Sequence, residues 1–189
     1  MFERLGNLSA HQIETLEAHY HLLVKWNQVL NLTRIDTIGE AVERHYGESL
    51  FLAEHLPPGP LRICDIGSGA GFPGFPVAVF RPDCTVTLIE SHQRKSVFLR
   101  EASRKVPNIR ILTKRAEEVD SIFDIAISRA VSYDDLAKSL KRLAPRAVLL
   151  TGSEAPPEKI GFVWSEPIPL PSSKQRFLRT GIRPEKCFT

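Results

Sequence analysis

The sequence predicts an α/β fold, in which N-terminal helices precede a mostly parallel, doubly wound sheet that ends in a C-terminal antiparallel hairpin. Three observations indicate this fold. After residue 60, short apolar runs alternate with helical segments; a glycine-rich loop follows the first run; and Pro57-Pro58-Gly59-Pro60 separates this region from a helical one. We therefore divide the chain into a helical extension, 1–57, and a sheet domain, 61–189, that form one compact unit. The length of 189 residues and the 42% of apolar residues exclude a disordered or fibrous chain.

Helices and strands follow from the periodicity of the apolar residues. Two helices are predicted before the prolines, 9–30 behind a Ser9/Gln12 capping box and 38–54 behind Thr37 and Glu40. Five apolar runs then predict parallel strands at 61–66, 85–89, 109–113, 123–128 and 147–151, with helical segments between them at 74–80, 91–105 and 132–143. The runs 162–165 and 176–182, separated by three prolines, predict the terminal hairpin.

Several classes of protein are excluded by what the sequence lacks. Cys64, Cys84 and Cys187 form no Cys-x-x-Cys pair, which argues against a zinc ribbon and a disulfide framework and favours a reducing, cytoplasmic location. No apolar run reaches the roughly 18 residues of a membrane span, and no secretory leader is evident. His19-x-His21 places its two rings on different faces of a helix, so we expect no metal site. We expect a monomer.

Charge is distributed unevenly along the chain. Residues 1–60 carry a net charge of −4 and residues 61–189 one of +7. Within 94–115 a single acid, Glu101, stands among eight basic residues: Arg94, Lys95, Arg100, Arg104, Lys105, Arg110, Lys114 and Arg115. A field of this sign attracts polyanions such as RNA, although a solvated helix face has the same composition.

The glycine-rich loop predicts a cofactor site and leaves two classes of cofactor open. Its sequence over 65–74 is DIGSGAGFPG, with Glu90 at the end of the next strand. Gly69-x-Gly71-x-x-Gly74 followed by Glu90 matches the fingerprint of dinucleotide-binding proteins. The spacing that starts at Asp65 resembles motif I of Rossmann-like methyltransferases, in which an acid such as Glu90 bonds ribose hydroxyls. Asp65 favours the second interpretation, because a carboxylate stabilises a cationic sulfonium and amine but gains nothing beside a pyrophosphate.

Further short motifs are more specific than the loop. They lie at 26–33 (WNQVLNLT), 44–45 (RH), 49–50 (SL), 90–91 (ES), 94–95 (RK), 98–99 (FL), 115–118 (RAEE), 127–130 (ISRA) and 176–178 (RFL). With these motifs and the loop, nearly the whole chain resembles the ribosomal RNA small-subunit methyltransferase G family, also called glucose-inhibited division protein B. It departs from the family pattern at Glu48 and Glu90, where aspartate is usual, and at Thr151-Gly152, where Lys-Gly is usual and a cation near the site is lost.

The resemblance implies a Rossmann-like class I methyltransferase that transfers a methyl group from S-adenosylmethionine to N7 of a guanine in 16S ribosomal RNA of the small ribosomal subunit. From the resemblance and the pattern together, the expected cofactor-binding residues are Asp65, Gly67, Ser68, Gly69, Gly71, Phe72, Glu90, Ser91, Ala116, Glu117 and Arg129. The expected RNA-binding residues are Lys25, Asn31, Arg34, Arg94, Lys95, Arg115 and Arg176.

Ser128 and Arg129, at the end of the fourth strand, are the candidate catalytic residues. An arginine that ends an apolar strand needs an anionic ligand or a salt bridge to an acid. Guanine N7 carries a lone pair and no proton, so the reaction needs no general base and rests on positioning. Two alternatives stay open: a nicotinamide-dependent oxidoreductase, and a non-catalytic RNA-binding or ribosome-assembly module.

Overall fold

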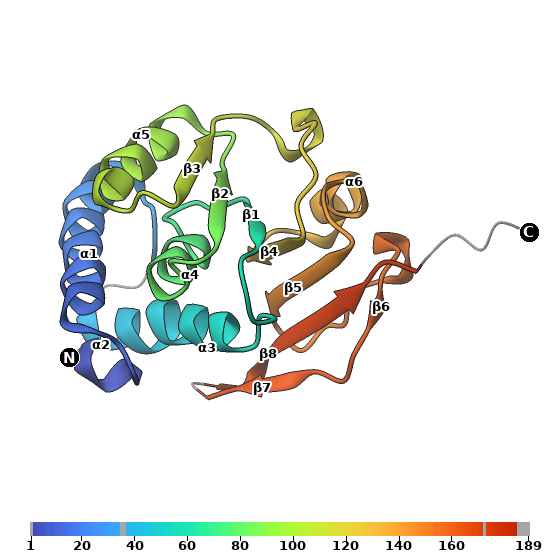
Figure 1. The fold of residues 1–189 in the computed structure, drawn as a ribbon, viewed down its shortest axis with the longest axis horizontal. Coiled ribbons are helices and arrows are strands. Elements are labelled where there is room, and N and C mark those ends of the chain that lie inside the picture. The colour runs from blue at the N-terminus through green and yellow to red at the C-terminus, as the bar shows by residue number, and fades with distance from the viewer. Residues whose placement is uncertain (1, 35–36, 172, 185–189) are drawn as a thin grey trace, which may run out of the picture.

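A computed structural model describes residues 2–34, 37–171 and 173–184 and shows a sheet covered by helices on both faces (Figure 1). The strands are β1 (Arg62–Ile66), β2 (Thr85–Ile89), β3 (Ile109–Leu112), β4 (Ile125–Arg129), β5 (Arg146–Thr151), β6 (Val163–Trp164), β7 (Ile168–Leu170) and β8 (Ser173–Ile182). The helices are α1 (Ala10–Leu30), α2 (Ile38–Glu40), α3 (Glu48–Glu54), α4 (Gly74–Phe80), α5 (Gln93–Ala102) and α6 (Tyr133–Leu143). A π-helix, η2 (Ala41–Gly47), joins α2 to α3, and short 3-10 turns are η1 (Phe2–Leu5), η3 (Ser103–Lys105), η4 (Ala116–Glu118) and η5 (Glu158–Ile160).

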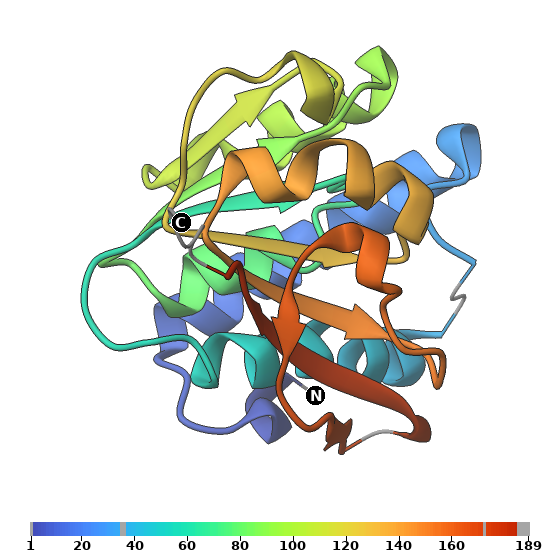
Figure 2. The ribbon, with the colours of Figure 1, turned by 90° about the vertical axis from the view of Figure 1, so that its right-hand side faces the viewer.

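The sheet has the order β3-β2-β1-β4-β5-β8-β6, and its first five strands are parallel. The order turns back at β1, so the carboxyl ends of β1, β2 and β4 meet at the edge where open α/β sheets bind ligands. Strand β8 runs antiparallel to β5, and β6 and β7 both pair with β8 at the edge of the sheet. Figure 2 shows α6 crossing one face of this sheet, with β8 beside β5.

Successive residues of each strand point into different halves of the core, as the period of two requires. Ile63 packs in a large cluster with side chains of α1, α3, α4 and α5, such as Leu16 and Phe75. Its neighbour Cys64 packs in a second cluster with α6, for example against Leu140. Both faces are therefore buried, and α1 packs directly on α4 and α5. The division at residues 57–61 into an extension and a domain stays a prediction.

The predicted helices form with the caps that the sequence specifies. The Ser9 hydroxyl accepts a hydrogen bond from the Gln12 backbone, and the Gln12 side chain accepts one from the Ser9 backbone, at 3.3 and 2.8 Å. Ser132 caps α6 in the same way through the Asp135 backbone. The predicted helix over 38–54 is continuous, but its middle turns are the π-helix, which periodicity alone did not predict.

The C-terminal hairpin is confirmed, but its prolines do not separate two strands as we expected. Pro169 lies inside β7, opposite Phe177 of β8. A proline fits there because β7 pairs only with β8, so its other edge needs no N–H donor. Cys64 and Cys84 are buried free thiols, whereas Cys187 lies outside the described residues. No helix in the described part of the chain is long and apolar enough to cross a membrane.

Candidate functional site

The glycine-rich loop leaves the carboxyl end of β1 in a conformation that requires glycine. Gly67, Gly69 and Gly71 have φ angles of +71°, +56° and +92°, in the left-handed region that other residues rarely adopt. At Gly74 the helix α4 begins so close to the sheet that a Cβ atom would lie 2.4 Å from a methyl carbon of Leu88. These four glycines are therefore required by the backbone conformation of the loop and by its close approach to the sheet.

Hydrogen bonds from β2 hold the first half of the loop. The backbone N–H groups of Gly67 and Ser68 donate to the carbonyl of Ile89 at 2.9 and 3.1 Å. The N–H of Gly69 donates to Oε2 of Glu90 at 2.9 Å, and Oε1 of the same carboxylate accepts from the backbone of His92 at 2.7 Å. The Glu90 carboxylate therefore holds the loop backbone, but each of its oxygens retains a lone pair that can accept a hydrogen bond from a further donor.

Asp65 is fully buried beneath the loop. Its Oδ2 accepts the Gly74 N–H at 3.1 Å, while Oδ1 has no hydrogen-bond partner among the residues that the structure describes. Burial raises the pKa of Asp65 from 3.8 to about 7, against the opposing effect of the Gly74 hydrogen bond. A buried polar atom without a partner is costly, so Oδ1 points to a donor that a ligand supplies.

A cavity of about 180 Å³ lies beside the loop at the carboxyl ends of β1 and β2. It brings together five of the predicted cofactor residues, namely Gly67, Glu90, Ser91, Ala116 and Glu117. The other six predicted cofactor residues are not among those that line it, namely Asp65, Ser68, Gly69, Gly71, Phe72 and Arg129. The Phe72 ring instead stacks on His45 of the π-helix, with ring centroids 4.6 Å apart, so it faces the N-terminal helices.

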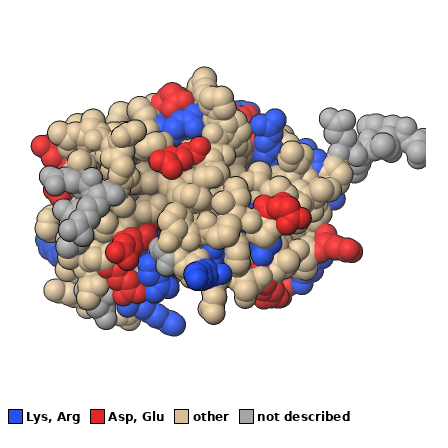
Figure 3. All heavy atoms as spheres, turned by 90° about the horizontal axis from the view of Figure 1, so that it is seen from below, with Lys and Arg blue, Asp and Glu red and all other residues tan. Residues whose placement is uncertain are grey.

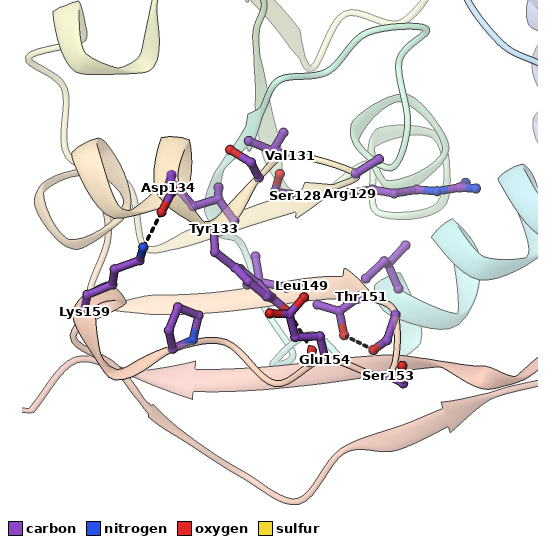
Figure 4. A pocket seen from close by; sticks show the side chains of 16 residues that line it. Ser128, Arg129, Val131, Tyr133, Asp134, Leu149, Thr151, Ser153, Glu154 and Lys159 are labelled. Atoms are coloured by element: carbon purple, nitrogen blue, oxygen red, sulfur yellow. Dashed lines mark hydrogen bonds and ion pairs between the residues drawn. The ribbon is translucent and has the colours of Figure 1, made fainter.

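A larger cavity of about 760 Å³ lies beyond the ends of β4 and β5 (Figure 4). Ser128 and Arg129 contribute to it from β4, and Tyr133, Thr151 and Glu154 from the segments that follow β4 and β5. The Tyr133 hydroxyl donates to the carbonyl of Glu154 at 2.8 Å, which fixes the ring in the wall. The buried Ser128 hydroxyl donates to the carbonyl of Ile66 at 2.8 Å and so ties β4 to the start of the glycine loop.

Arg129 points away from the larger cavity in Figure 4, toward the N-terminal helices. It donates to the Arg44 carbonyl of the π-helix at 2.9 Å and lies 3.8 Å from the Glu48 carboxylate. Burial lowers the pKa of Arg129 to about 10, although Glu48 acts in the opposite direction. The prediction that this arginine needs an anionic partner is confirmed, and the partner is an acid of the chain itself.

Glu48, which the sequence indicated only as a departure from the family pattern, was not predicted as a residue of this site. It is 1% exposed, and its Oε2 also lies 2.7 Å from a guanidinium nitrogen of Arg176. Arg129 of β4 and Arg176 of β8 both pair with Glu48, and Arg44 of η2 contacts Arg129 through its backbone carbonyl while its guanidinium pairs with Glu40. We call Glu48 and these three arginines the arginine cluster. Arg176, which was predicted to bind RNA, thus uses one guanidinium nitrogen for its ion pair with Glu48. The signal in the sequence was that Glu48 keeps an acid at a position where the family pattern has aspartate.

A cation lies at the end of β5, where Thr151 stands in place of the lysine that is usual in the family. Arg179 of β8 lies opposite Leu149 of β5, and its Nε donates to the Thr151 hydroxyl at 3.1 Å. A second nitrogen donates to the carbonyl of Ser153 at 3.2 Å, and the guanidinium lies over the Phe177 ring. The antiparallel register of β8 therefore brings an arginine to this strand end, whereas position 151 itself holds the uncharged threonine that departs from the family pattern.

The other predicted RNA-binding residues lie on the surface. Those with exposed positions are Lys25, Asn31, Arg34, Arg94 and Arg115, and Lys95 is half-buried. The basic stretch 94–115 does not form one patch, because α5 carries the chain from the carboxyl edge of the sheet to the opposite edge and β3 returns it. Arg115 lines the small cavity and Arg94 lies in the first turn of α5, whereas Lys105 lines a groove with Ser9 at the other edge. From below, Figure 3 shows acidic and basic side chains interspersed.

Comparison with known proteins identifies the family. The sequence profile of the rRNA small subunit methyltransferase G family matches residues 12–151. The chain belongs to this family. The resemblance drawn from the short motifs is thereby confirmed.

Relatives in this family include proteins named ribosomal RNA small subunit methyltransferase G. The one from Mycoplasma capricolum is 40% identical over 74% of this chain and 64% of its own length. That from Chromobacterium violaceum is 42% identical over 66% of this chain and 61% of its length, and that from Methylobacillus flagellatus is 38% identical over 85% and 81%. The matched part thus spans less than two thirds of the first two relatives.

Solved structures confirm the fold class. A putative RNA methyltransferase from Pyrococcus horikoshii superposes with a TM-score of 0.62 at 17% identity, over 94% of this chain and 100% of its own. An S-adenosylmethionine-dependent methyltransferase from Aquifex aeolicus gives a TM-score of 0.61 at 15% identity, over 80% and 96%. The architecture is that of a Rossmann-like class I methyltransferase.

Proposed function

We propose that this member of the family transfers a methyl group from S-adenosylmethionine to N7 of a guanine in 16S ribosomal RNA of the small ribosomal subunit. The observation that carries the proposal is the 180 Å³ cavity, where the glycine loop, Glu90, Ala116 and Glu117 converge at the carboxyl edge of the sheet. The family membership supports the reaction. The protein acts as a monomer in the cytoplasm.

The residues present fit this cofactor. Asp65 offers an unpartnered buried oxygen to a cationic ligand, and the left-handed glycines let a ligand approach the backbone. Glu90 has lone pairs for ribose hydroxyls, while Ser91, Ala116 and Glu117 line the space for the base. When bound, S-adenosylmethionine supplies an electrophilic methyl carbon on its sulfonium. A pyrophosphate would repel the buried Asp65, which argues against a nicotinamide cofactor.

The chain's own residues contribute positioning more than proton transfer. Guanine N7 has no proton to lose, so no side chain needs to act as a base. Ser128 and Arg129 act as positioning residues, because Ser128 fixes the loop through Ile66 and Arg129 fixes the π-helix through Arg44. The target base enters from the 760 Å³ cavity, whose wall includes Tyr133, and exclusion of water there aids in-line attack.

RNA is held by the basic groups at the carboxyl edge. In the arginine cluster the guanidinium groups of Arg129 and Arg176 share the Glu48 carboxylate, and the solvent-exposed Arg44 pairs with Glu40. The arginine cluster and the other predicted RNA-binding residues provide phosphate contacts that fix the register of the RNA without reading its sequence. These other residues are Lys25, Asn31, Arg34, Arg94, Lys95 and Arg115.

The proposal is tested by transfer of labelled methyl from S-adenosylmethionine to small ribosomal subunits that lack their native guanine methylation. We expect label at one guanine, mapped by chain cleavage at 7-methylguanine. Cofactor binding without transfer would overturn the substrate and favour a non-catalytic RNA-binding module. Absence of cofactor binding would overturn the interpretation of the glycine loop.

A further inference from the structure

His19 of α1 is a buried imidazole that the proposed reaction does not use. It is 2% exposed, and both ring nitrogens are engaged. Nδ1 lies 2.6 Å from the Tyr46 hydroxyl of the π-helix, and Nε2 lies 3.1 Å from the carbonyl oxygen of Ala70 in the glycine loop. One side chain thus connects both N-terminal helical segments to the loop.

The direction of these hydrogen bonds is determined by their partners. The Ala70 carbonyl can only accept, so Nε2 carries the proton and Nδ1 accepts from the Tyr46 hydroxyl. Burial lowers the pKa of His19 to about 3 and raises the pKa of Tyr46 well above its usual value. Both side chains are therefore neutral in the physiological pH range. The hydrogen bonds are donated in one direction, from Tyr46 to His19 and from His19 to Ala70.

The contacts around the ring leave it little freedom. It stacks on Phe75 of α4 with centroids 4.2 Å apart and meets Phe72 edge-on at 5.4 Å. A Cβ atom at Gly71 would lie 3.2 Å from Nε2, so the ring occupies the space that this glycine leaves. Because the ring is packed this closely, its position couples the position of α1 to that of the loop backbone.

The loop is accordingly held by hydrogen bonds to side chains from two different parts of the fold. Glu90 of the sheet accepts the Gly69 N–H at 2.9 Å, and His19 of α1 donates to the neighbouring residue, Ala70, at 3.1 Å. Without His19, the buried Ala70 carbonyl would have to move to find another donor. Any such movement changes the backbone on both sides, where Gly69 and Gly71 adopt left-handed conformations.

We propose that the His19–Tyr46 pair positions the glycine loop for cofactor binding, which makes the N-terminal helices part of the cofactor site. This proposal rests on the proposed function in that the ligand of the loop is S-adenosylmethionine. His19 and Tyr46 are positioning residues, since they act through the Ala70 backbone. Their loss raises the Kd of the cofactor in protein that is still folded.

The test compares variants that keep or remove the N–H directed at Ala70. His19→Met fills a similar volume without a donor, whereas His19→Gln retains an amide N–H. Tyr46→Phe removes only the hydroxyl, and Tyr20→Phe is the matched control, since the half-buried Tyr20 ring lies on α1, the helix of His19, near Phe2. The Kd of S-adenosylmethionine and of S-adenosylhomocysteine is measured by calorimetry, and the midpoint of thermal unfolding is measured without ligand.

We expect His19→Met to raise both Kd values about tenfold, Tyr46→Phe about threefold, and His19→Gln and Tyr20→Phe less than twofold. If His19→Met lowers the thermal midpoint but leaves the Kd unchanged, the pair is structural only and the proposal is overturned. If His19→Met does not fold, equal Kd values for Tyr46→Phe and Tyr20→Phe overturn it. If the unsubstituted protein does not bind the cofactor, the proposed function fails instead.

Discussion

The small cavity beside the glycine loop and the large cavity beyond β4 and β5 lie at the same edge of the sheet, yet different parts of the chain hold them in place. The small one is lined by residues within or just after β1, β2 and β3, together with Val131 and Asp135 after β4, and its loop is fixed by short hydrogen bonds to the neighbouring strand. The large one depends on contacts between distant segments, such as Arg179 with Thr151. The same contrast holds for the arginine cluster, where Arg129 meets Glu48. Short hydrogen bonds to the adjacent strand thus hold the glycine loop, together with the contact from His19 of α1, whereas these arginine contacts join strand ends to segments far away in the sequence.

The largest effect is expected where the loop has no room for a side chain. In Gly67→Ala, the new Cβ would lie 2.5 Å from a methyl carbon of Val131, at a φ of +71°. Relief of this overlap must shift the loop, so we expect the Kd of S-adenosylmethionine, measured by calorimetry, to rise about a hundredfold.

Gly59→Ala is the control, since Gly59 has a similar φ of +86° with nothing within 4 Å of the Cβ position. It should lower the free energy of unfolding by about 1 kcal/mol and leave the Kd unchanged. A Kd for Gly67→Ala within threefold of the unsubstituted protein would show that the loop tolerates a side chain.

The second effect concerns the arginine cluster. Glu48→Gln leaves the buried guanidinium groups of Arg129 and Arg176 without their carboxylate, so we expect the free energy of unfolding to fall by about 3 kcal/mol in urea titrations. Methylation of RNA should decrease more than cofactor affinity. The exposed pair of Glu40 with Arg44 provides the control, and Glu40→Gln should cost less than about 1 kcal/mol. Equal losses in the two variants would contradict the buried role of Glu48.

The third effect is a pH dependence of cofactor binding. With its pKa raised to about 7, Asp65 is protonated and neutral below pH 7 and ionised above it. A cationic ligand prefers the ionised form, so its affinity should increase as pH rises toward 7 and reach a plateau above it. Below pH 7 the Kd should rise by at most about tenfold per pH unit.

Calorimetry between pH 6 and pH 8.5 measures this dependence. Asp65→Asn keeps the shape and an oxygen for the Gly74 N–H, and it should bind the cofactor weakly at every pH. A profile of the unsubstituted protein that is flat over this range would place the ligand's cation away from Asp65.

The smallest effect separates the two ends of the basic stretch. Replacement of Arg94 and Lys95 by alanine should weaken RNA binding about fivefold and reduce the slope of log affinity against log salt by about 2. Replacement of Arg104 and Lys105, which lie toward the opposite edge of the sheet, should change affinity less than about twofold. Filter binding at several salt concentrations measures both. Equal losses would show that RNA wraps around α5.

Most of the fold could be predicted because its signals are local. Periodicity and caps place α1, α4 and α6 within a residue or two, and the apolar runs place β1 to β5. The π-helix and β7 were missed for a physical reason. A π-helix differs from an α-helix only in its hydrogen-bond register, and Pro169 argues against a strand unless the strand lies at an edge.

The residues of the site likewise fall into those with a local signal in the sequence and those without one. Asp65, the glycines and Glu90 could be read from spacing, because a loop between a strand and a helix has few geometries. His19, Glu48 and Arg179 could not, because each acts on a residue at least 28 positions away, as in the 51-residue separation of His19 from Ala70. An isolated histidine or acid in a helix carries no local sign of such a partner.

The sequence by itself determined the class of fold, the family, and a cofactor loop whose glycines and acids are close along the chain. Only the tertiary structure decided which charges pair with one another and which helix holds the loop. The physical reason is that backbone conformation depends on neighbours in sequence, whereas burial and ion pairing depend on neighbours in space. Arg129 shows both, since its place at the end of β4 follows from the sequence and its partner Glu48 follows from the fold.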